Sequence, residues 1–286
     1  MSHSTARVRG IQRSAFTGEH PITARTGLGR GSIGLDECSP AQAHLRALLA
    51  FGWFNQGILA APGFDWWLGS TLNYGTVISP RYDHLVLIVS AAPNVADQLA
   101  ASPSWSGIPG LRLERTVGWK TVLLRHLPTG ASLEITELSQ PKAPRQTGDV
   151  LRLQRLRSVE QPVTREEQDK LDTLPQMTVA ARRLLAAVAI RSTLRDPEGS
   201  WHVHWCHNTL KRPRGRNDRA ERRLWGSGNL WCLEWMSYPY PSDLIAAMSH
   251  PVAGLAGIDI QQDGSSWVLT YEGAQLRLYD REAPLW

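Results

Sequence analysis

Long apolar runs and paired cysteines are missing from this sequence of 286 residues. No run reaches about 18 consecutive apolar residues, so we expect no membrane-spanning helix. The N-terminal stretch lacks the apolar core of a secretory signal. The three cysteines, Cys38, Cys206 and Cys232, form no CxxC pair. We therefore expect a cytoplasmic protein without a disulfide framework.

Several catalytic signatures are also absent. The sequence contains no GxSxG elbow, no P-loop and no HExxH motif. These absences exclude the α/β-hydrolases, the P-loop nucleotidases and the zincin metalloproteases as sequence-based assignments.

Lysine is scarce, although the chain is basic. Only four of the 31 basic residues are lysine, and the net charge is +5 with a pI near 9.4. Arginine suits phosphate and guanine better than lysine does, because its planar fork donates two hydrogen bonds at once. Codon usage in a GC-rich genome would give the same excess, so the positions of the arginines are more informative than their number.

Two segments, 84–137 and 229–280, resemble copies of one unit. In this alignment Asp97 matches Asp243, Trp119 matches Trp267, and Leu133 and Ile135 match Leu276 and Leu278. The piece Ile258–Ile260 then falls on a strand that corresponds to Leu111–Leu113. Each copy reads as strand, helix, strand, strand, strand. Duplication within one chain predicts a pseudo-two-fold body with a shared seam between its halves.

The predicted fold class is α+β, with two pseudo-symmetric lobes that each combine a leading helix with a βαβββ unit. The leading helices are expected after Ser39, where Pro40 suits the first helical position and Gln42 completes a capping-box spacing, and around Leu184–Ile190. A capping box at Thr164 and Glu167 starts a further short helix. We expect helices on one face of each sheet. The expected divisions are a basic, loosely ordered arm at 1–36, a first lobe at 37–137, a linker at 138–163 that includes a possible strand in DVLRLQRLR, and a second lobe at 164–286.

An arginine-rich insertion at 211–223 lies in the second lobe, before its aligned copy, and has no equivalent in the first lobe. Seven like charges repel one another unless a polyanion or solvent compensates them. Phosphates would compensate them, and neighbouring tryptophans could stack on unpaired bases. The candidate nucleic-acid-binding residues are Lys211, Arg212, Arg214, Arg216, Arg219, Arg222, Arg223, Trp205 and Trp225.

A histidine-rich segment lies just before this insertion. On a strand, His202, His204 and Cys206 would share one face and could bind a divalent metal such as zinc or manganese. His202-Val203-His204 resembles the metal-binding motif of the HUH endonucleases. That resemblance covers three residues and implies nicking of single-stranded DNA by a tyrosine on a later helix. The available tyrosines, Tyr238 and Tyr240, precede the helix expected at Ser242–Met248.

Three functions therefore remain open. The first is binding of nucleic acid, with DNA favoured over RNA, through the arginine-rich insertion and the basic arm. The second is a metal-dependent nuclease or other phosphate-processing enzyme that uses the histidine segment. The third is an assembly protein, or a homo-oligomer, that contacts a protein partner through a tryptophan-rich seam.

Overall fold

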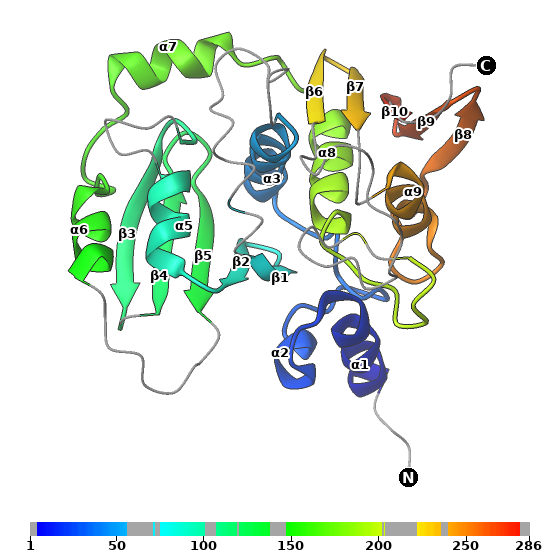
Figure 1. The fold of residues 1–286 in the computed structure, drawn as a ribbon, viewed down its shortest axis with the longest axis horizontal. Coiled ribbons are helices and arrows are strands. Elements are labelled where there is room, and N and C mark those ends of the chain that lie inside the picture. The colour runs from blue at the N-terminus through cyan, green and yellow to red at the C-terminus, as the bar shows by residue number, and fades with distance from the viewer. Residues whose placement is uncertain are drawn as a thin grey trace.

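Two five-stranded sheets with the same strand order form the framework of the computed structural model (Figure 1). The first sheet runs β1-β2-β5-β4-β3 and the second runs β6-β7-β10-β9-β8. The structure describes residues 5–55, 71, 75–100, 107–118, 120–137, 147–201, 203, 222–235 and 240–280. Within these residues the predicted α+β fold with two similar lobes is confirmed.

The first sheet contains β1 (Gly75–Pro80), β2 (His84–Val89), β3 (Leu111–Val117), β4 (Thr121–His126) and β5 (Ala131–Glu137). The second contains β6 (Arg222–Ser227), β7 (Leu230–Trp235), β8 (Asp259–Asp263), β9 (Ser266–Tyr271) and β10 (Ala274–Asp280). In both sheets the central pair, β2 with β5 and β7 with β10, is parallel and the other pairs are antiparallel.

The ladders confirm most of the sequence alignment between the copies. Leu133 lies opposite Leu85 in the first sheet, and Leu276 lies opposite Trp231 at the same place in the second. Ile260 pairs with Leu269 as Leu113 pairs with Leu124. The strand predicted at Ile258–Ile260 is therefore present from Asp259 onward.

Two paired positions in the alignment were out of register. Helix α5 (Ala92–Leu99) and helix α9 (Pro241–Ser249) share a buried proline at their start, and under that match Asp243 corresponds to Val95, two residues before Asp97. Trp267 lies opposite Leu278, the place that Val122 occupies opposite Ile135. Its predicted partner Trp119 lies outside the described residues. Each copy also has a leading strand, β1 or β6, that lies before the aligned segment.

Helices α3 (Pro40–Trp53) and α8 (Val179–Arg191) pack against each other between the sheets and carry most of the seam (Figure 1). Ser39 caps α3 as predicted, because its side chain accepts a hydrogen bond from the amide of Gln42 at 3.2 Å. Gln42 does not complete a capping box; its amide instead donates to the carbonyls of Asp83 and Ser132. One apolar core runs through both lobes, and strand burial alternates, so the helices cover one face of each sheet.

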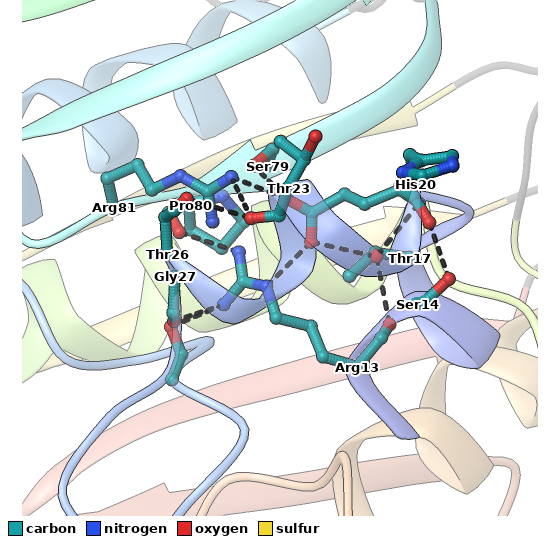
Figure 2. Close-up of polar contacts among 12 residues, drawn as sticks. Arg13, Ser14, Thr17, His20, Thr23, Thr26, Gly27, Ser79, Pro80 and Arg81 are labelled. Atoms are coloured by element: carbon teal, nitrogen blue, oxygen red, sulfur yellow. Dashed lines mark hydrogen bonds and ion pairs between the residues drawn. The ribbon is translucent and has the colours of Figure 1, made fainter. Parts of the chain in front are cut away.

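The N-terminal arm is ordered from Thr5 onward, which corrects the expectation of an extended, loosely ordered segment. It contains α1 (Thr5–Thr17) and α2 (Pro21–Arg25), joined around a buried cluster of polar side chains (Figure 2). Arg13, fully buried, donates to Glu19 at 2.6 Å and to the carbonyls of Gly27 and Pro80. Arg81, just after β1, donates to Glu19 at 2.9 Å.

This cluster keeps Glu19 ionised inside the protein. Burial alone would raise the pKa of Glu19, but Arg13, Ser79 and Arg81 outweigh it and hold the pKa below its usual value. The arm has no apolar stripe in its sequence, and buried polar contacts help to hold it against the first lobe. That is why hydrophobic periodicity failed to predict its helices.

The predicted linker also contains structure. The segment DVLRLQRLR is mostly helical, as α6 (Thr147–Arg155), and not a strand. Helix α6 packs on α5, and Val159 donates to the carbonyl of Leu113 on the outer strand β3. Helix α7 (Arg165–Thr173) follows, with the predicted Thr164–Glu167 capping box in place. In the part of the chain that the structure describes, no helix has the length and apolar character needed to cross a membrane.

Candidate nucleic-acid interface

The outward face of the second sheet carries aromatic and cationic side chains that are close in sequence to the arginine-rich insertion. Side chains alternate along a strand, so Leu224 of β6 and Leu278 of β10 point into the core and are fully buried. Their neighbours Arg223, Trp225 and Tyr279 share the opposite face and are half-buried. Strand β6 forms one edge of this sheet.

These three side chains contact one another directly. The guanidinium of Arg223 lies 5.0 Å from the ring centroid of Trp225. The rings of Trp225 and Tyr279 have centroids 6.5 Å apart and planes only 7° apart. The result is a cation beside two nearly parallel rings, spanning β6 and β10 across the intervening strand β7. Parallel aromatic rings with an adjacent arginine can accept stacked bases and pair with their phosphates.

Other charges on this face are of both signs. Glu234 of β7 lies between Arg223 and Tyr279 in the ladder. Arg277 of β10 donates to Asp263 of β8 at 2.7 Å, and β8 lies at the opposite edge of the sheet from β6. Burial raises the pKa of the Cys232 thiol, which keeps that side chain neutral between the charged groups. At the β6 edge of this face the described cation is Arg223, the last residue of the arginine-rich insertion.

Arg222 does not belong to this surface, although the sequence grouped it with the phosphate-binding residues. It points inward from β6, is 1% exposed, and its guanidinium lies 4.5 Å from the ring centroid of Trp235. Burial lowers its pKa well below the usual value. A buried guanidinium in this position supports the core and cannot reach a phosphate in solution.

Most of the other predicted site residues lie outside the described residues: Trp205, Lys211, Arg212, Arg214, Arg216, Arg219, His202, His204, Cys206 and Tyr238. Tyr240 is described, and it occupies the position just before α9, so it precedes that helix as the sequence indicated. Trp201 and Val203, which flank His202, are both buried. The metal site at His202, His204 and Cys206 stays a prediction that the zinc and manganese content of the purified protein would test.

The described residues themselves contain no group of three or more histidine, cysteine or carboxylate side chains able to hold a metal ion.

Sequence reasoning missed Tyr279 as a member of this surface. The only available signal was parity, because Arg277 and Tyr279 alternate with Leu276 and Leu278 in the last strand. Parity does not reveal that β10 lies two strands from β6. That neighbour relationship comes from the crossover topology of the sheet.

Comparison with known proteins adds no assignment to this geometry. No family model matches the chain, and neither the curated proteins nor the solved structures include a significant match to it.

Proposed function

We propose that this protein binds single-stranded nucleic acid, with DNA favoured over RNA, across the outward face of its second sheet. The observation that carries the proposal is the array formed by Arg223, Trp225 and Tyr279. Bases would stack on the two rings, and the phosphates would follow the β6 edge toward the arginine-rich segment at 211–221. Stacking on aromatic side chains tolerates any base, so affinity should depend weakly on sequence and strongly on salt.

The aromatic part of this proposal can be tested by fluorescence anisotropy with a labelled oligothymidine at low salt. Replacing Trp225 or Tyr279 with leucine should weaken binding about 5-fold to 150-fold, the equivalent of about 1–3 kcal/mol for each stacked base. Tyr82→Leu is the matched control, because Tyr82 is 65% exposed and lies in the first lobe. No affinity for the oligonucleotide at low salt, or equal weakening in all three variants, would refute this interface.

The cationic part has its own signature. The triple variant R212A/R214A/R216A should weaken binding to all sequences. It should also flatten the plot of log affinity against log salt by about 0.7 for each phosphate that the variant no longer neutralises. Arg222→Met should not change that slope, because Arg222 is buried against Trp235. An unchanged slope in the triple variant would leave the arginine-rich segment without a role in binding.

A further inference from the structure

A cleft of about 740 Å³ opens where the two lobes meet, away from the outward face of the second sheet. The loop before α3, helix α3, the turn between β1 and β2, helix α8 and strand β9 all contribute to its walls. Its polar lining residues are Arg30, Asp36, Glu37, Cys38, Arg46, Tyr82, Arg183 and Tyr271. The volume falls in the range of small-molecule sites.

Arg46 is the unusual member of this lining. It is 1% exposed, and its side chain donates to the backbone carbonyls of Arg81, at 2.5 Å, and His84, at 3.4 Å. Its Nε atom has no hydrogen-bond partner in the described part of the chain. Among the residues that the structure describes, no carboxylate forms an ion pair with it. A buried guanidinium without a carboxylate is costly, because burial removes the water that would otherwise stabilise its charge.

The nearby carboxylates already have other partners. Asp36 accepts both its hydrogen bonds from Arg191, at 2.6 and 2.7 Å. Glu37 accepts from the backbone amide of Arg30 at 3.1 Å and from Ser32 at 3.1 Å.

At the rim, Arg183 is paired with Glu272 at 3.1 Å. Arg183 and Arg191 thus each have a carboxylate partner. Among the described residues Arg30 and Arg46 have none, and of these two only Arg46 is buried.

From this arrangement we infer that the cleft binds a small organic anion whose phosphate or carboxylate group pairs with Arg46. Both groups match the arginine fork, which donates two parallel hydrogen bonds to either. Arg30 and Arg183 lie at the mouth, where they would attract the ligand, and Tyr82 and Tyr271 supply ring surface and hydroxyl groups. Burial raises the pKa of the Cys38 thiol, so this group adds no competing negative charge. This site is separate from the proposed nucleic-acid interface and does not depend on it.

The probes are inorganic phosphate, citrate and adenosine monophosphate, each compared with sodium chloride at equal ionic strength. Titration calorimetry and thermal unfolding of the full chain should show saturable binding of at least one of them. Phosphate and adenosine monophosphate without citrate would identify a phosphoryl ligand, and citrate alone would identify a carboxylate ligand. If none of the three stabilises the protein beyond the chloride control, the inference is overturned.

Variants locate the binding. Arg46→Gln keeps part of the side-chain stem but removes the charge, and it should weaken the binding about 10-fold to 100-fold. Because Arg46 is buried, that variant could fail to fold, so the rim variant R30Q/R183Q provides a second measure and should weaken binding about 2-fold to 5-fold. Arg165→Gln should leave anion binding unchanged, because Arg165 is exposed on α7 and does not line the cleft. Equal anion affinity in the wild type and the rim variant, or weaker binding in Arg165→Gln, would place the anion elsewhere.

Discussion

The buried carboxylates Glu19 and Glu167 are each held by several partners at once, and Glu167 is the clearer case. Its carboxylate accepts from Arg112 at 2.6 and 2.8 Å, from Arg157 at 3.2 Å, and from the amide of Thr164 at 2.9 Å. Burial alone would raise the pKa of Glu167, but the hydrogen bonds from Arg112 and from the amides of Thr164 and Gly110 outweigh burial and lower the pKa to about 2. One residue therefore both caps α7 and fastens it to the edge strand β3.

Glu167→Gln should destabilise the protein at pH 7 by about 3–5 kcal/mol, because Arg112 is fully buried and would lose its counter-ion. The pH dependence has a definite sign. The unfolded chain takes up the proton near pH 4.5, whereas the folded protein resists it until about pH 2. Stability from this group is therefore complete above pH 4.5 and is lost, by up to about 3 kcal/mol, as the pH falls toward 2.

Urea unfolding at several pH values between 7 and 2.5 measures both effects. Glu166→Gln is the control, because its carboxylate is adjacent in sequence but its side chain is 79% exposed. The wild-type curve should fall more steeply below pH 4.5 than the curve of Glu167→Gln. Parallel curves for the two proteins would contradict the role given to this carboxylate.

At the scale of single residues, helix caps could be predicted from the sequence, but the side of a sheet to which a strand side chain points could not. Ser39 and Thr164 cap helices as their spacing indicated. Arg222 and Arg223 had to face opposite sides of a strand, but only the packed sheet shows that Arg222 is the buried one. The face of a strand that meets the core depends on neighbours distant in sequence.

Secondary-structure elements were predictable where apolar residues set the period. The strands of both copies and helices α3 and α8 follow that rule. Helices α1 and α6 do not, because their sequences are polar and their contacts depend on the rest of the fold: Arg13 of α1 reaches the carbonyl of Pro80, and α6 packs on α5. Strand β6 follows the arginine-rich segment, whose charges masked its alternation.

The edge of β6 is supported by a side chain from the other lobe. Asn55, fully buried beyond the end of α3, donates to the carbonyl of Leu224 at 2.9 Å and accepts from the amide of Leu224 at 3.2 Å. The asparagine amide thus takes the place of a neighbouring strand at that position. It also connects the first lobe to the strand that carries Arg223 and Trp225.

Asn55→Ala should leave two buried backbone groups unsatisfied and cost about 1–3 kcal/mol. Hydrogen exchange followed by mass spectrometry should show faster exchange in peptides covering β6, beyond the change in global stability. Asn94→Ala in α5 is the control for the substitution itself. Unchanged exchange in β6 would mean that Asn55 does not support this edge.

The whole molecule is a duplication whose halves share one core. Helix α3 of the first lobe contacts the second sheet directly: Phe51 lies edge-on to Trp231 at 6.3 Å between centroids, and Phe54 lies 5.6 Å from Trp235. Similar strand order therefore does not imply independent domains. The sequence predicted the duplication and the seam, but not that apolar side chains cross the seam to this extent.

This shared core predicts that the two lobes unfold together. Amides of β5 and β10, at the centre of the first and second sheets, should exchange with the same free energy and the same dependence on urea. Phe54→Ala should lower the free energy of exchange of both strands by about 3–5 kcal/mol, because the side chain is fully buried at the seam. A substitution confined to the first lobe, Leu133→Ala, should likewise lower the protection of β10. If β5 and β10 lost protection at different urea concentrations, or if Leu133→Ala affected β5 alone, the lobes would be separate folding units that merely touch.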